Sequence, residues 1–439
     1  MPSEKRVMTA FFRNSALTIV LSVVVFVPGC SSDTQNNIVL VIVDTLAAEH
    51  MSCYGYHRET SPNIDSLAAE GVLYARSQAQ APWTLPAMVT IYTGLTARSH
   101  GCIFREGFAW GLDPDMPILP EYLGDEGYAT AAFVNIGYLG PMYGMDKGFD
   151  HFSMPEDAGH GRAAETVDET IAWMDSDGFE EPFLLVFHVF DPHLPYEPPE
   201  PYDTMYCSEG LDGHTEWKTD EEGNWYPEQR QHMVDLYDSE IRWTDSQIGR
   251  LLGELRARGL EDRTLVILTA DHGEEFLEHG DWGHGPNLYQ HAIHVPLVLS
   301  GPGVESGVDS SVVGQYDVLP TVLGYCGIPI PEHVEGTDLL AGMIPSNRPV
   351  PSSGVFVDND SVQAAVRRGD KKVIWSRAGD RSEQYDLAAD PGEQSPLAAD
   401  SALLEEVLVY WATPCICSPT EYERREIQER KLRDLGYID

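Results

Sequence analysis

Several uninterrupted runs of β-branched and aliphatic residues limit what this chain can fold into. Residues 37–43 (NIVLVIV), 182–190 (PFLLVFHVF) and 264–270 (TLVILTA) contain almost no polar positions. A strand with this pattern is buried on both faces, as in a parallel sheet. Helical patterns lie between these runs, at residues 61–71 and 231–259. The sequence therefore predicts an α/β fold with a mostly parallel central sheet flanked by helices.

The chain has 439 residues, which is enough for one large domain and a smaller one. Its composition changes near residue 345, where a Pro- and Ser-rich link (346–354) precedes short strand-like segments and a charged stretch that predicts a helix over 420–435. We expect a main domain over residues 37–345 and a small C-terminal α+β domain over residues 346–439. Residues 203–231 are polar and acidic, which predicts a long surface loop.

The first thirty residues are typical of an export signal. They begin with basic residues and continue with a largely apolar run over 16–27, which is shorter than the ~20 residues needed to span a bilayer. The run ends in Val-Pro-Gly-Cys, which resembles the lipobox of bacterial lipoproteins, so Cys30 would carry the lipid and residues 31–36 would form a polar tether. Cleavage without lipidation of Cys30 is the alternative. We expect an exported protein, lipid-anchored at the periplasmic or cell-surface face of a bacterial cell envelope.

Acidic residues dominate the charge of the chain. There are 70 acidic and 28 basic residues, for a formal net charge of −42. A surface of this charge repels phosphate backbones, which argues against nucleic acid as a partner. Six cysteines remain after the leader, and in an exported protein they could form disulfides or stay as free thiols; the sequence leaves this open.

Two of the predicted buried strands end in carboxylates. Asp44 follows the first run, and Asp271 with His272 follows the run at 264–270. Ligands gather outside the carboxyl ends of strands in an open parallel sheet, so we expect these three side chains at one edge. One such acid alone would more simply cap a loop, whereas two acids and a histidine favour a metal site.

Thr84 is the candidate nucleophile. It precedes Pro86 and a helical pattern that stops at Gly94, an arrangement typical of a helix start and end. A hydroxyl at a helix N-terminus lies among unpaired backbone N–H groups, where an anion can bind. The simpler alternative is that Thr84 only caps the helix.

Together, Asp44, Thr84, Asp271 and His272 form a mixed oxygen and nitrogen donor set. This set suits Zn²⁺ or Mn²⁺ best, with Mg²⁺ or Ca²⁺ also compatible. A divalent ion would lower the pKa of a coordinated hydroxyl and so activate the threonine for attack on phosphorus or sulfur.

The order of motifs resembles the sulfatase-like family of the alkaline phosphatase superfamily. The resemblance rests on residues 37–86, HVFDPHLPYEPP (188–199), YDSEIRWTDSQIG (237–249), TADHGEEFLEHGDWGHG (269–285) and VPLVLSGPG (295–303). Residues 365–375, 385–393 and the terminal LRDLGYID resemble the small C-terminal domain of that family. The match covers nearly all of the chain after the leader, and residues 37–345 would be the catalytic domain.

The resemblance implies roles for individual residues. Asp44, Asp271 and His272 would bind metal, and Thr84 occupies the position of the nucleophile. His193 would contact the anion or protonate the leaving group, and His284 lies near where the family often has a lysine that grips sulfate. Four further residues are weaker candidates, with core or helix-face roles equally compatible: His188, Asp245, Glu274 and His279.

Departures from the family pattern change the expected chemistry. Sulfatases convert a Cys or Ser in a C/S-x-P-x-R motif to formylglycine, but here Thr84 and Met88 stand in place of the first and last residues, and Asn135 replaces a Lys-x-His pair. We therefore predict a metal-dependent hydrolase or transferase of anionic esters, with phosphoesters favoured and a small molecule, glycan or lipid headgroup as the substrate. The alternatives are a sulfatase without formylglycine and a non-catalytic surface binder of sulfated or phosphorylated glycans.

Overall fold

The computed structural model describes residues 35–105, 108–208, 229–354, 362–417 and 420–421. The predicted signal peptide and lipobox lie outside these residues, as does most of the polar segment 203–231. From Gln35 onward the chain forms one compact unit. In the described residues, no helix is both long and apolar enough to cross a membrane.

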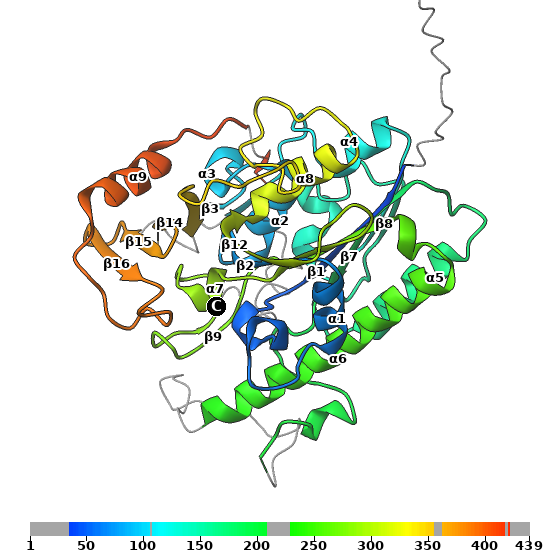
Figure 1. Cartoon of the computed structure of the whole chain (residues 1–439), viewed down its shortest axis with the longest axis horizontal. Coiled ribbons are helices and arrows are strands. Elements are labelled where there is room, and N and C mark those ends of the chain that lie inside the picture. Colours follow the sequence, from blue (N-terminus) through cyan, green and yellow to red (C-terminus); the bar gives the residue numbers. More distant parts are fainter. Residues whose placement is uncertain (1–34, 106–107, 209–228, 355–361, 418–419, 422–439) are drawn as a thin grey trace, which may run out of the picture. The chain divides into compact units, whose positions relative to one another are not determined.

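A central sheet of eight strands carries the fold (Figure 1). Its order is β12 (Gly307–Gly314), β2 (Val72–Gln78), β11 (Leu297–Ser300), β8 (Thr264–Ala270), β1 (Asn37–Val43), β7 (Phe183–Val189), β5 (Ala129–Phe133) and β6 (His151–Ser153). All pairs are parallel except those of β11, which runs antiparallel to β2 and β8. The predicted α/β fold with a mostly parallel sheet is therefore confirmed.

Helices cover both faces of this sheet. The core on one face contains side chains of α1 (Pro62–Glu70), α5 (Ala163–Met174) and α6 (Arg230–Ala257). The core on the other face contains side chains of α2 (Thr84–Thr93), α4 (Leu119–Asp125) and α8 (Val318–Tyr325). Alternate residues of β1 point into the two cores, which explains its unbroken apolar sequence.

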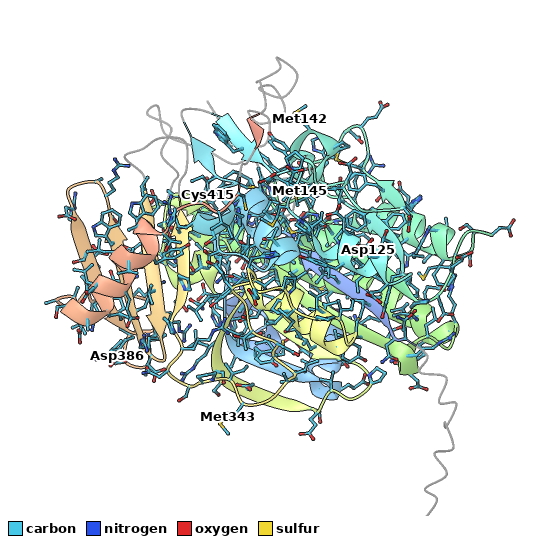
Figure 2. All side chains as sticks on the ribbon, turned by 90° about the horizontal axis from the view of Figure 1, so that it is seen from above. Asp125, Met142, Met145, Met343, Asp386 and Cys415 are labelled. Carbon is cyan, nitrogen blue, oxygen red and sulfur yellow. The ribbon has the colours of Figure 1, made fainter. Side chains whose placement is uncertain are left out.

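Side chains fill the space between the ribbons (Figure 2). Met145 is buried against the α2 face of the sheet, whereas Met343 is 98% exposed on the loop after α8. Asp245 on α6 accepts hydrogen bonds from the backbone N–H groups of Asn63 and Ile64 at the start of α1, so it caps that helix. This is the core role that the sequence left open for Asp245.

The C-terminal part contains an antiparallel sheet of four strands, β13 (Val350–Gly354), β14 (Gln363–Arg368), β15 (Lys371–Ser376) and β16 (Arg381–Asp386). Helix α9 (Ser401–Ala412) packs on β14 and β15, and this core also includes Ala87 of α2. The C-terminal sheet domain is therefore confirmed, while its predicted boundary at residue 345 stays a prediction.

Two local predictions for this part were wrong. The Pro- and Ser-rich link contains a strand, β13, because Pro351 lies on an edge strand, where its missing N–H group is tolerated. The predicted helix over 420–435 does not begin at Thr420, since Thr420–Glu421 form a short strand, β17, that pairs with β4 (Phe108–Gly111); the rest of that stretch lies outside the described residues. The six cysteines after the leader all lie in the described residues, and no disulfide joins them there.

Candidate active site

The register of the central strands brings the two acidic residues together. Val43, the last residue of β1, is the partner of Ala270, the last residue of β8, in a parallel pair. Asp44 and Asp271 come next on each strand, so they leave the sheet side by side despite their separation in sequence. The neighbouring β7 places His188 opposite Ile42 on the other side of β1. The expected meeting of strand-end ligands is therefore what the structure shows.

Hydrogen bonds from the surrounding loops fix Asp271. Its Oδ1 accepts hydrogen bonds from the backbone N–H groups of Thr45 (3.1 Å) and His272 (2.8 Å). The side-chain amide of Gln315 donates to the carbonyl oxygens of Ala270 and Asp271, both at 2.6 Å. The carboxylate is thus held by both strand-end loops, with its Oδ2 left facing the site.

Tyr237 fixes the loop after Asp44. Its hydroxyl donates to the carbonyl oxygen of Thr45 at 2.6 Å and accepts from the backbone N–H of Ala47 at 2.9 Å. Thr45 has a positive φ of 55°, which is uncommon outside glycine, so this loop conformation needs such support. Sequence reasoning missed Tyr237 as a supporting residue, because a tyrosine on an amphipathic helix looks like any other core residue.

Thr84 is the first residue of α2 and is fully buried. Trp83 occupies the cap position and Gly94 ends the helix in the left-handed region, so the alternative that Thr84 only caps the helix is wrong. The Thr84 Oγ1 lies 3.4 Å from Nε2 of His272. That nitrogen is also 3.3 Å from Asp271 Oδ2 and 3.6 Å from Asp44 Oδ1. All four predicted metal-site residues therefore converge.

Several polar atoms at this point are buried without a hydrogen-bond partner in the part of the chain that the structure describes. They are both carboxylate oxygens of Asp44, Oδ2 of Asp271 and both ring nitrogens of His188. Buried polar groups are normally paired, so such a concentration needs a partner. Asp44, His188 and Asp271 each offer one donor atom within 4.8 Å of the others, which fits a divalent cation. His188 was only a weak candidate in the sequence, although a histidine inside an apolar strand was the available signal.

The pKa shifts of the two carboxyl groups reflect how closely the acidic residues are packed. Burial, followed by the negative charges of Asp271 and Glu274, raises the pKa of Asp44 well above its ordinary value. Burial opposes ionisation of Asp271 too, but the neighbouring His272 lowers the pKa of Asp271 below its ordinary range. The ring Nδ1 of His272 lies 3.0 Å from the carbonyl oxygen of Gly273, so Nδ1–H donates a hydrogen bond to that oxygen. When the ring is neutral, the lone pair is then on Nε2 and faces Thr84.

Two more histidines face the same space. The ring of His284 lies 4.3 Å from that of His272 and 5.0 Å from that of His193, measured between ring centroids. Burial lowers the pKa of His193 to about 3 and lowers that of His284 as well, so both are neutral at pH 7 in the absence of a ligand. The two predicted catalytic histidines are therefore beside the candidate metal site, and their roles stay predictions.

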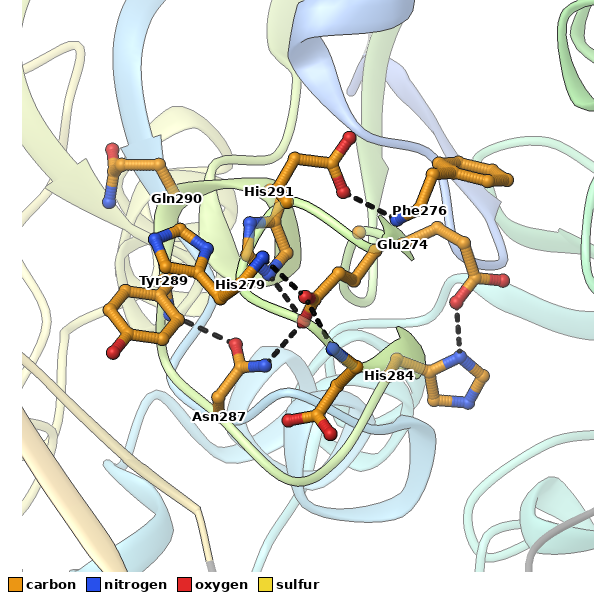
Figure 3. A network of polar contacts seen from close by, with 12 residues as sticks. Glu274, Phe276, His279, His284, Asn287, Tyr289, Gln290 and His291 are labelled. Atoms are coloured by element: carbon orange, nitrogen blue, oxygen red, sulfur yellow. Dashed lines mark hydrogen bonds and ion pairs between the residues drawn. The ribbon is translucent and has the colours of Figure 1, made fainter. Parts of the chain in front are cut away.

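Glu274 orients His284. Its Oε1 is 2.9 Å from Nδ1 of His284, and its Oε2 accepts a hydrogen bond from the Tyr196 hydroxyl at 2.9 Å. A dashed line marks the contact between Glu274 and His284 in Figure 3. Burial raises the pKa of Glu274 to about 7. In contrast, Met88 is buried in the apolar core and Asn135 donates to the carbonyl oxygen of His160, so neither supplies a cation to this site.

Comparison with known proteins places this geometry in a family. The sulfatase family model matches residues 36–328, about two thirds of the chain. The chain belongs to the sulfatase family. This match confirms the predicted sulfatase-like family, whose members are metal-dependent hydrolases of ester bonds.

Individual sulfatase relatives are distant. Arylsulfatase K of Bos taurus is 25% identical over 69% of this chain and 65% of its own length. A protein solved with its substrate D-glucosamine-2-N,6-O-disulfate has a TM-score of 0.70 and 20% identity, over 91% of this chain and 98% of that one. The phosphonate monoester hydrolase of Agrobacterium radiobacter has a TM-score of 0.69 and 22% identity, over 92% of this chain and 96% of that one. At this identity the solved structures establish the fold alone.

Proposed function

We propose that this chain is a metal-dependent esterase that uses Thr84 as a covalent nucleophile, with phosphate esters preferred over sulfate esters. The observation that carries the proposal is the position of the Thr84 hydroxyl, 3.4 Å from His272 Nε2 at the start of α2. A hydroxyl in this place can be activated on one side and can meet an anionic substrate at the helix N-terminus on the other.

Asp44, Asp271, His272 and Thr84 would hold the cation, and the unpaired His188 offers a further nitrogen. The mixed oxygen and nitrogen donors favour Zn²⁺ or Mn²⁺, with Ca²⁺ or Mg²⁺ compatible. When bound, such an ion lowers the pKa of a coordinated hydroxyl and neutralises charge on the substrate ester. The surrounding loops contribute rigidity, because Tyr237 and Gln315 hold the strand ends that carry the two carboxylates.

His193 and His284 would contact the ester group and handle protons. Both are neutral in the ligand-free site, but an anionic ester beside them favours their protonated forms and so raises their pKa values. A proton held on His193 could then pass to the leaving oxygen, while Glu274 keeps the ring of His284 in place. We expect both histidines to bind and orient the anion before any bond breaks.

The preference for phosphate esters follows from the missing formylglycine chemistry. Thr84 cannot be oxidised to the aldehyde that sulfatases use, and the cations of the sulfatase pattern are replaced by Met88 and Asn135. The fold relative that hydrolyses phosphonate monoesters supports a phosphorus-centred substrate. A sulfate ester of a glycan is the second candidate, supported by the fold relative solved with a disulfated glucosamine. Loss of activity, leaving a glycan binder, is the third.

Substitution of Thr84 tests the mechanism. We expect Thr84→Ala to lower kcat/KM by at least about 10³-fold on aryl phosphates, phosphodiesters or phosphonates with Zn²⁺ or Mn²⁺ supplied, while Thr84→Ser keeps measurable turnover. Thr90→Ala is the matched control, because Thr90 lies on the same helix but bonds His100 instead of the site. Wild-type turnover by Thr84→Ala would rule out this nucleophile. Aryl sulfates assayed in parallel decide between phosphate and sulfate.

We also propose that the chain is exported and anchored to a bacterial cell envelope through a lipid on Cys30. The support is the basic start, the short apolar run and the lipobox-like end of residues 1–30. A membrane surface would then lie close to the enzyme and limit its substrates to those outside the cytoplasm.

A further inference from the structure

A second group of donor atoms lies behind the candidate active site. Glu275, His279 and His291 each place one possible ligand atom within 4.8 Å of the other two. Glu275 belongs to the short strand β9 (Glu275–Phe276) and directly follows Glu274, which bonds His284. Neighbouring strand residues point to opposite sides, so Glu275 faces away from the active site. Figure 3 shows this separation, with His279 and His291 on one side and Glu274 with His284 on the other.

The tautomer of His279 leaves a lone pair in this cluster. Its Nε2 lies 3.0 Å from the carbonyl oxygen of Glu393, which can only accept, so Nε2 carries the proton. The side-chain nitrogen of Gln394 is 3.4 Å from the same atom, but that amide donates to the carbonyl oxygens of Glu278 and Gly392. In the neutral ring this tautomer leaves the lone pair on Nδ1, which is buried and has no hydrogen-bond partner among the described residues. A histidine that donates one N–H to a carbonyl and keeps the other nitrogen free has the arrangement of a metal ligand.

The carboxylate of Glu275 is held in place by four hydrogen bonds. Its Oε2 is 3.0 Å from His291 Nε2 and accepts from Asn287 at 2.6 Å, while its Oε1 accepts from the backbone N–H groups of His279 and Asp281. Burial, followed by the negative charge of Glu275, raises the pKa of the Asp281 carboxyl. An ion pair between Glu275 and His291 alone would account for part of this cluster, but it gives no partner to Nδ1 of His279.

We propose that Glu275, His279 and His291 bind a divalent transition metal ion, with Zn²⁺ the best fit. Two imidazoles and one carboxylate form a common zinc donor set, in which a water molecule can take the fourth position. Zn²⁺ with bonds of about 2.0–2.2 Å keeps its ligand atoms roughly 3.5 Å apart, so binding draws the three donors together. The ring of His279 is fixed for this by stacking on Tyr289 at 3.6 Å between centroids.

The proposed ion would stabilise the loop between Glu274 and His284, which contributes these two residues to the candidate active site. Glu275 and His279 lie between Glu274 and His284, and His291 begins the segment that leads back to the sheet through α7 (Gln290–Ile293). An ion joining these three residues would fix the loop from behind, without touching the substrate. This role is independent of Thr84 and of the proposed esterase chemistry.

Zinc stoichiometry tests the second site once the first is disabled. The full chain with Asp44→Asn and Asp271→Asn is stripped with a chelator, dialysed against Zn²⁺ and analysed for metal per chain. We expect one retained zinc per chain, lost when His279→Gln is added and kept when the exposed His333→Gln is added instead. If the double variant retains no zinc, or if His279→Gln does not change the amount retained, the proposal is overturned.

A spectroscopic measurement covers the case in which His279→Gln fails to fold. The double variant loaded with Co²⁺ should show the visible absorption bands of a low-coordinate ion with imidazole ligands. Weak bands typical of hydrated, octahedral Co²⁺ would overturn the proposal without any change to the cluster itself.

Discussion

Replacing Asp44 with asparagine should change stability in opposite directions with and without metal. Asp44 is fully buried, and among the described residues neither of its carboxylate oxygens has a hydrogen-bond partner. The basic groups beside it there are His272 and His188, each at 3.6 Å. Asp271 and Glu274 repel it. In the metal-free protein at neutral pH the folded state must therefore either bury this charge or take up a proton, and both cost free energy that asparagine of the same shape avoids.

The size of the effect follows from two opposing costs. An ion without a good partner costs several kcal/mol to bury, whereas a buried amide without a partner costs about 1–3 kcal/mol. The metal-free Asp44→Asn variant should thus exceed the wild type in unfolding free energy by about 1–3 kcal/mol at neutral pH. With an unfolding entropy of about 2 cal/mol/K per residue, this raises the melting temperature by about 1–4 °C for a chain of this length.

Bound metal should make the wild type more stable than the Asp44→Asn variant. An ion present at about 1,000 times its Kd stabilises the folded wild type by about 4 kcal/mol, and the variant, with one ligand weakened, gains little of this. The assay is thermal or urea unfolding of both proteins in chelator and in excess Zn²⁺ or Mn²⁺. Asp245→Asn is the control, because Asp245 caps α1 and its loss should destabilise the protein equally in both conditions. A metal-free Asp44→Asn less stable than the wild type would refute the reasoning.

Three further predictions concern two groups around the site and the proposed lipid anchor. Burial raises the pKa of Glu274 from 4.5 to about 7, so the folded protein holds this proton more tightly than the unfolded chain does. The unfolding free energy of the metal-free protein should therefore fall as the pH rises between these two values. Urea unfolding across this pH range should show a smaller fall for the Glu274→Gln variant. Tyr237→Phe leaves two buried backbone groups unpaired and should lose about 2–4 kcal/mol in urea unfolding, against about 1 kcal/mol for Tyr74→Phe, whose hydroxyl makes one hydrogen bond; equal losses would contradict this. Cys30→Ala should move the protein from the membrane fraction to the soluble fraction of an expressing bacterium, and unchanged fractionation would count against the lipid anchor.

The strand runs and their carboxylate ends were readable in the sequence because burial on both faces demands continuous apolar residues. Asp44, Asp271 and His272 could therefore be assigned to one sheet edge without coordinates. The weak calls were residues whose type is common in cores. His188 and Glu274 could not be separated from structural residues such as Asp245, since their roles depend on which side chains of distant segments lie beside them.

The sequence by itself determined the family, the parallel sheet and the set of residues that can meet at its edge, because these follow from local pattern and strand polarity. Only the tertiary structure decided the pairing of β1 with β8, the support of Thr45 by Tyr237 and the separation of Glu274 from Glu275 into two clusters. These depend on register and side-chain direction, which are set by long-range packing and have no signature within any single segment.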